Sequence, residues 1–243
     1  MRRTTTSLAL AAAAALAMTA TANAAPSQDF NITAKPAKSS TSSKKFPVTV
    51  DFSTGTKDDP GVQPPTTSKA AVFFPAGAVW NGDLFPKCAA SSISSAKSTD
   101  DCPSGSIVGK GKAAGLAPGP ITQNDLTIIA VNGGKDRLNL FVEGTSPLRI
   151  QSNLDVKIKK ASGDFGLSLN VDIPQNLQEP APGVPVAITL FQVKVGKTIK
   201  VKGKTRGITE VNKCNGTWKA KGVFTYKDGT SATVNDSLKC TKG

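Results

Sequence analysis

Apolar and polar residues alternate in short runs along most of the chain after residue 29. A period of two places successive side chains on opposite faces of an extended strand, so each run predicts a strand with one buried face. Clusters of Gly, Pro, Asn, Asp and Ser separate the runs, as turns do between antiparallel strands. The expected strands are residues 30–34, 48–52, 70–74, 107–113, 126–131, 138–142, 154–158, 167–173, 186–195, 199–205, 217–226 and 232–238.

Signals for helices are few, and residues 89–97 are the one stretch where a turn or two of helix is expected. Many short strands without long helices between them predict an all-β fold, an antiparallel β-sandwich of the jelly-roll or Ig-like type. We expect a single domain over residues 30–243, preceded by a mobile stretch at residues 25–29. The Pro-rich residues 175–185 are the best candidate for a domain boundary, but we interpret them as a long loop because few strands follow.

Residues 1–24 have the pattern of a cleaved secretory signal peptide. Arg2 and Arg3 precede an apolar run at residues 8–18, and an Ala-Asn-Ala cleavage site ends at Ala24. A membrane-spanning helix is the alternative, but it needs about 20 apolar residues and this run is shorter. We therefore expect cleavage after Ala24 and a secreted protein, extracellular or loosely associated with the envelope, with no transmembrane segment.

The chain contains four cysteines, which in an exported protein predict two disulfides. Three connectivities are possible, and the short sequence separations favour Cys88 with Cys102 and Cys214 with Cys240. A zinc ion held by all four thiolates is the alternative, but such sites use closely spaced C-x-x-C pairs in a reducing compartment. We expect neither feature here, and no motif in the chain implies a metal or another cofactor.

The protein is strongly basic, with 30 Lys and Arg against 17 Asp and Glu and a formal net charge of +13. Histidine is absent, which excludes Ser-His-Asp and Cys-His nucleophiles and histidine metal ligands. Beyond the signal peptide the only arginines are Arg137, Arg149 and Arg206, against 25 lysines. Specific nucleic-acid binding relies on Arg forks and aromatic platforms, so a specific nucleic-acid partner is not expected.

The densest run of cations lies in the expected strand at residues 199–205. Alternation places Lys200, Lys202, Lys204 and Arg206 on one face of that strand. Such a cationic strip attracts anionic polymers, and an exported protein meets these at the cell surface. The alternative is a solvated face, or a lysine-rich sheet edge that discourages aggregation.

Catalysis would have to depend on carboxylates because histidine is absent. Glycoside hydrolysis needs two carboxylates at a defined separation, and no E-x-D or E-x-E strand motif occurs. The pairs Asp58-Asp59 and Asp100-Asp101 lie in turn-like sequences, where Asp commonly forms local backbone hydrogen bonds. We therefore expect a protein that is not an enzyme.

Several motifs recur together over most of the chain beyond the signal peptide. They are Pro86-Lys87-Cys88, Cys102-Pro103, Gly109-Lys110-Gly111-Lys112-Ala113, and a C-terminal pair, Cys214 and Cys240, around Phe224-Thr225-Tyr226-Lys227-Asp228-Gly229. This set resembles a group of secreted bacterial proteins, common in actinobacteria, that have no established activity. The resemblance implies export, the two local disulfides and a β-rich fold, and it gives the Cys and Gly positions an architectural role.

Gly109 and Gly111 support that architectural interpretation independently. They alternate with Lys110 and Lys112, so both lie on one face of a strand, where the missing side chains let a neighbouring element approach. A phosphate-binding loop is the alternative, but residues 113–118 provide neither a G-K-[ST] ending nor a helix start.

These observations lead to one functional hypothesis and one alternative. The hypothesis is an exported, non-catalytic binding or structural protein that associates with anionic envelope polymers through Lys200, Lys202, Lys204 and Arg206. The alternative is a carboxylate-dependent, glycan-active enzyme. The sequence does not identify the ligand or the oligomeric state.

Overall fold

The computed structural model describes residues 26–36, 45–119, 121–212 and 217–239, and nearly all of its regular structure is β-strand. The elements are β1 (Ser27–Pro36), β2 (Lys45–Lys57), β3 (Thr67–Pro75), β4 (Val79–Trp80), η1 (Gly82–Leu84), α1 (Ala90–Ala96), β5 (Ile107–Ala117), β6 (Ile121–Gly134), β7 (Arg137–Gly144), β8 (Ile150–Lys160), β9 (Phe165–Asp172), α2 (Gln175–Gln178), β10 (Ala187–Val195), β11 (Thr198–Val201), β12 (Lys204–Gly207), β13 (Thr209–Asn212), β14 (Thr217–Tyr226) and β15 (Ser231–Lys239). The all-β prediction is confirmed, and α1 forms where the short helix was expected.

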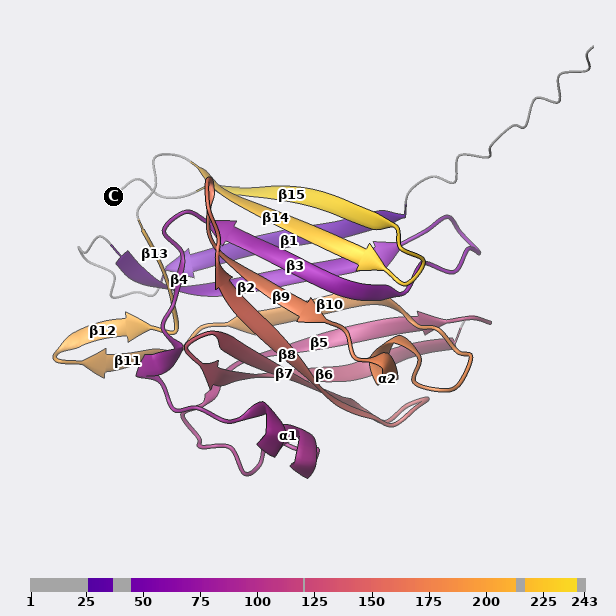
Figure 1. Cartoon of the computed structure of the whole chain (residues 1–243), viewed down its shortest axis with the longest axis horizontal. Coiled ribbons are helices and arrows are strands. Elements are labelled where there is room, and N and C mark those ends of the chain that lie inside the picture. The colour runs from indigo at the N-terminus through magenta and orange to yellow at the C-terminus, as the bar shows by residue number, and fades with distance from the viewer. Residues whose placement is uncertain (1–25, 37–44, 120, 213–216, 240–243) are drawn as a thin grey trace, which may run out of the picture.

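One continuous sheet of 13 strands replaces the two stacked sheets of the expected sandwich. Its order is β15-β14-β3-β9-β8-β7-β6-β5-β10-β2-β13-β4, with β1 also paired to β2, and the pairings are antiparallel. The sheet curls until β15 lies next to β1, so its concave face encloses an apolar interior (Figure 1). Hairpin connections between sequential strands explain the single sheet, because each new strand pairs with the one before it from β5 through β9.

Glycines on β2 and β5, the two strands that pair with β10, allow the β10 backbone to approach closely. A Cβ atom at Gly109 would collide with the carbonyl oxygen of Lys194, and one at Gly111 would collide with that of Gln192. Gly55 on β2 meets the backbone of β10 from the other side in the same way. The expectation that Gly109 and Gly111 make room for a neighbouring element is therefore confirmed.

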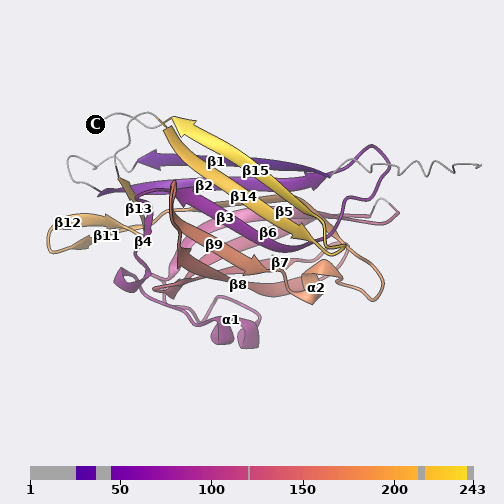
Figure 2. The same cartoon turned by 45° about the horizontal axis from the view of Figure 1, so that its top comes forward.

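The two ends of the curled sheet meet at a seam between β1 and β15 (Figure 2). The backbone N–H of Ile32 donates to Asp236 Oδ2 at 2.9 Å, and the rings of Phe30 and Phe224 contact each other edge to face, with centroids 6.3 Å apart. β1 begins at Ser27, so the stretch 25–29 that was expected to be mobile is part of the first strand from Ser27 onward. Ser27 lies opposite Lys57 of β2 in this pairing.

A second, smaller core lies on the outer face of the sheet, beneath α1. Ile93 of α1 packs there with Val131 and Phe141, next to a disulfide between Cys88 and Cys102. This bond confirms the first predicted pairing. Cys214 and Cys240 lie outside the described residues, as does the expected signal peptide, and the second pairing stays a prediction.

The seam gives a direct test of how the sheet is closed. Replacing Asp236 with Ala removes the acceptor of the Ile32 amide, and we expect the free energy of unfolding to fall by about 1.5 kcal/mol, as for hydrogen bonds to charged groups. Asn235→Ala, at the exposed neighbouring position, is the matched control and should change it by less than about 0.5 kcal/mol. Urea denaturation measures both, and equal losses in the two variants would contradict a role for the seam.

Candidate functional site: an apolar cavity inside the sheet

The interior of the curled sheet contains a cavity of about 200 Å³. Its walls are mostly inward-facing aliphatic and aromatic side chains, among them Phe52, Leu140, Leu154 and Val193 from four different strands. Apolar cavities of about 150 Å³ stay dry and hold guests such as benzene. The space is therefore large enough for a small apolar molecule or part of a chain.

Small residues at inward positions explain why the interior is not filled. Ala70 on β3 and Ala113 and Ala117 on β5 line the cavity where larger residues would close it. Protein interiors are otherwise close-packed, so such positions determine the hollow space. In the sequence, the small residues at alternate positions 113, 115 and 117 are the signal for this hollow space. They do not show which side chains lie opposite them across the interior, so the cavity could not be predicted from them.

Apolar side chains reach solvent at the end of the cavity near α2. Ile121 is 50% exposed and Leu148 is 37% exposed, and both also line the cavity. Large apolar side chains exposed at the rim of an apolar pocket are typical of binding sites. We call this end the mouth. At the opposite end Trp80 lines the cavity, and its indole N–H donates to the carbonyl oxygen of Gly134 at 2.8 Å.

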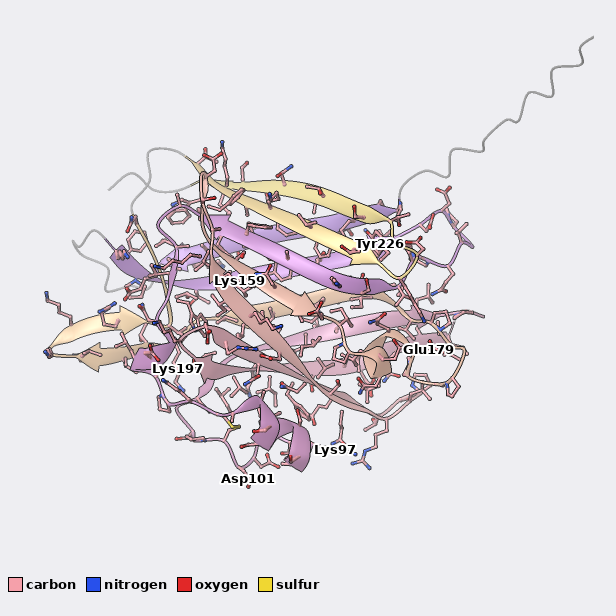
Figure 3. All side chains as sticks on the ribbon, viewed as in Figure 1. Lys97, Asp101, Lys159, Glu179, Lys197 and Tyr226 are labelled. Carbon is pink, nitrogen blue, oxygen red and sulfur yellow. A yellow bond between two sulfur atoms is a disulfide. The ribbon has the colours of Figure 1, made fainter. Side chains whose placement is uncertain are left out.

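A polar network lies on the wall of the cavity near the mouth. Gln28 Oε1 accepts hydrogen bonds from Thr56 Oγ1 and Tyr226 Oη, both at 2.9 Å, and its Nε2 donates to Thr54 Oγ1 at 2.6 Å. Burial raises the pKa of the Tyr226 hydroxyl, so it stays a hydrogen-bond donor at neutral pH. Figure 3 shows Tyr226 and Glu179 at the α2 end of the molecule, and Lys197 toward the end that carries β11 and β12.

Glu210 is the one ionisable side chain among the lining residues of the described chain. Its carboxylate is 3% exposed and accepts hydrogen bonds from Arg206 Nε at 2.9 Å and Arg206 Nη2 at 3.1 Å, and from the Gly207 amide at 3.0 Å. Burial alone raises the pKa of Glu210, but these hydrogen bonds outweigh it and the pKa is lowered. Glu210 is thus a structural anion that Arg206 neutralises.

The expected strand at residues 199–205 is wrong, because a turn divides it into the hairpin of β11 and β12. Lys202 and Gly203 adopt left-handed conformations, with φ of 49° and 76°, and reverse the chain there. The two strands form a sheet of their own, which projects from the main sheet at the end opposite the mouth (Figure 1).

This hairpin separates the cations that were expected to share one face. Lys200 lies opposite Thr205 and Val201 lies opposite Lys204, which places Lys200 and Lys204 on different faces. Lys202 is in the turn, and Arg206 is bound to Glu210. The single-faced ladder is therefore wrong, and a cluster of three exposed lysines around a hairpin tip takes its place.

Comparisons with protein-family models, with curated proteins and with solved structures find no match. Within the described ranges, no group of three or more His, Cys, Asp or Glu side chains is placed to hold a metal ion. The helices in that part of the chain are too short to cross a membrane. The cavity and the surface cations are therefore the features from which a function can be inferred.

Asp125 organises the loop at the mouth and makes it sensitive to acid. Its carboxylate accepts the amides of Thr145 at 2.7 Å and Ser146 at 2.9 Å, and these bonds, led by that of Thr145, lower the pKa from 3.8 to about 2. Because the folded pKa lies below the unfolded value, the carboxylate holds the loop above about pH 4 and releases it as the pH falls toward 2.

This acid sensitivity can be tested at the two amides that Asp125 accepts. We expect amide hydrogen exchange at Thr145 and Ser146, corrected for intrinsic rates, to lose protection as the pH falls from about 4 to 2. Unchanged protection at pH 2 would contradict this.

Proposed function

We propose that this chain is an exported, non-catalytic binding protein that holds an apolar ligand inside its curled sheet. The cavity carries this proposal, because ligand sites are concave, mostly apolar and equipped with few polar groups. The class of protein is the one expected from the sequence. The ligand differs from the expected polymer, because the cavity inside the sheet is lined mostly by apolar side chains and Lys200, Lys202 and Lys204 lie outside it.

The energetic cost of the cavity supports a function for it. At about 24 cal/mol per Å³, leaving about 200 Å³ unfilled costs about 5 kcal/mol. This is comparable with the whole stability of many domains, about 5–15 kcal/mol. A bound apolar ligand would recover part of this energy by filling the space and leaving water.

The chemistry of the lining supports binding rather than catalysis. A carboxylate-dependent glycosidase, the alternative class, needs two carboxylates on either side of a sugar, one of them free to donate a proton. Glu210 is engaged by Arg206 and shares the cavity with aliphatic and aromatic side chains. Export is part of the proposal, and the Cys88–Cys102 disulfide is compatible with an oxidising compartment.

Two neighbouring alanines on β3 provide a matched test. Ala70 lines the cavity, whereas Ala71 does not, and successive strand residues point to opposite faces. We expect Ala70→Phe to weaken binding of the apolar fluorescent probe N-phenyl-1-naphthylamine at least tenfold by occupying the space, and Ala71→Phe to leave it within about twofold. Fluorescence titration of the folded variants measures this, and an equal effect of both substitutions would contradict an interior site.

The hairpin of β11 and β12 supports a second function, attraction to anionic polymers. Lys200, Lys202 and Lys204 are exposed, and none of them forms an ion pair with the described residues. Each exposed contact contributes about 0.2–1 kcal/mol, so the three must act together. Protection of the hairpin against aggregation is the alternative role for the same lysines.

Salt dependence separates the two roles of the hairpin. Changing Lys200, Lys202 and Lys204 to Gln should abolish retention on acidic polysaccharide at low salt, which the unmodified protein should lose only as salt is raised. The control changes Lys157, Lys159 and Lys160 to Gln, which removes the same charge from β8 and should preserve retention. Equal loss in both variants would show that net charge alone is responsible, and increased aggregation without loss of binding would favour edge protection.

A further inference from the structure

Thr67, the first residue of β3, has a hydroxyl group without a hydrogen-bond partner among the described residues. Its side chain lines the cavity and is 4% exposed. Within the described ranges of the chain its hydroxyl forms no hydrogen bond, whereas four other polar lining residues, Gln28, Thr54, Thr56 and Gln123, all have partners. The hydroxyl oxygen is not one of the side-chain atoms that the protein encloses completely, so it borders the open space of the cavity. Hydroxyl groups inside proteins are normally hydrogen-bonded, and an unpaired one facing a cavity indicates a partner that arrives with a ligand.

The position of Thr67 defines where that partner would lie. In the sheet Thr67 is opposite Tyr226, whose hydroxyl is bound to Gln28. Tyr226 lies at the α2 end of the molecule, the end where Ile121 and Leu148 form the mouth (Figure 3). The free hydroxyl is therefore near the opening, and the apolar wall continues from it toward Trp80 at the other end.

The charge of the lining restricts the ligand further. Glu210 is the sole ionisable group among the described lining residues, and its charge is satisfied by Arg206. A ligand carboxylate or ammonium would enter without a counter-charge, and burying an unpaired charge is strongly unfavourable. A hydroxyl or carbonyl group has a much smaller desolvation cost, which one hydrogen bond from Thr67 can offset.

We propose that the cavity binds a neutral amphiphile, with its uncharged hydroxyl or carbonyl group on Thr67 at the mouth and its apolar chain directed toward Trp80. This rests on the proposed binding of an apolar ligand and names its class. Thr67 is the residue that distinguishes a neutral polar group from a plain hydrocarbon. The lack of an unpaired charge among the described lining residues distinguishes neutral ligands from ionised ones.

Four ligands of one chain length test the class. Octane, 1-octanol, methyl octanoate and octanoate are titrated at pH 7 against the protein loaded with N-phenyl-1-naphthylamine, and displacement of the probe is followed by fluorescence. We expect methyl octanoate to compete at least tenfold more strongly than octanoate, because the ester removes the charge and keeps the carbonyl group. Octanoate that competes as strongly as its ester would overturn the neutral class.

A Thr67→Val variant tests the residue. Valine has nearly the shape of threonine without the hydroxyl, so we expect 1-octanol to bind about 3- to 10-fold more weakly and octane to stay within about twofold. Thr225→Val, which replaces a threonine absent from the lining on the adjacent strand, is the control and should change neither affinity. Equal weakening of octanol and octane by Thr67→Val, or no weakening of octanol, would overturn the role of Thr67.

The two proposals fail in different ways in this experiment. If neither the probe nor any of the four ligands binds the folded protein, the proposed function is wrong and the ligand class falls with it. If the probe and octane bind while octanoate matches its ester, an interior site for apolar ligands stands and the neutral amphiphile is wrong.

Discussion

The interior of this protein depends on the bending of a single antiparallel sheet until its last strand reaches its first. Two features make this possible. Glycines at 55, 109 and 111 let the backbone of β10 approach its neighbours, and the carboxylate of Asp236 accepts a hydrogen bond from the backbone amide of Ile32 at the seam. A flatter sheet would leave its apolar face in water. The same curvature keeps opposite walls of the sheet apart, so large side chains at every inward position would be needed to fill the interior. Small residues such as Ala70 occupy some of these positions, and a cavity remains.

The sequence predicts the strands well because burial on one face imposes a period of two, and each expected strand outside residues 199–205 overlaps an observed one. The Gly109 and Gly111 pair and the Cys88–Cys102 bond were also predictable, since both follow from local spacing. The single continuous sheet was not predictable, because alternation identifies a buried face without showing which strands share a sheet. The cavity was hidden for the same reason: the size of Ala113 matters only once its neighbours across the interior are known.

The lysine strip shows how a local pattern can mislead. Alternating Lys and apolar residues fit one strand, yet the Lys-Gly pair at residues 202–203 forms a turn, and a turn changes which cations share a face. The same alternation and its positive charge place Arg206 with the lysines in the sequence. Its role became visible only with the tertiary contact to Glu210, a residue on β13 that the spacing of the strip does not suggest.

The lysine hairpin of β11 and β12 and the mouth of the cavity lie at opposite ends of the sheet, which determines whether one molecule can contact both. The lysine hairpin follows the end of β10 at Val195, whereas the mouth lies near the start of that strand, so the length of the sheet separates them. A protein held at an anionic surface by the hairpin would therefore turn its mouth away from that surface. Binding at one site would leave the other accessible, and since the two sites share no residues, substitutions in one should not alter the other's affinity. The geometry favours two independent contacts over a single site in which lysines and cavity bind the same molecule.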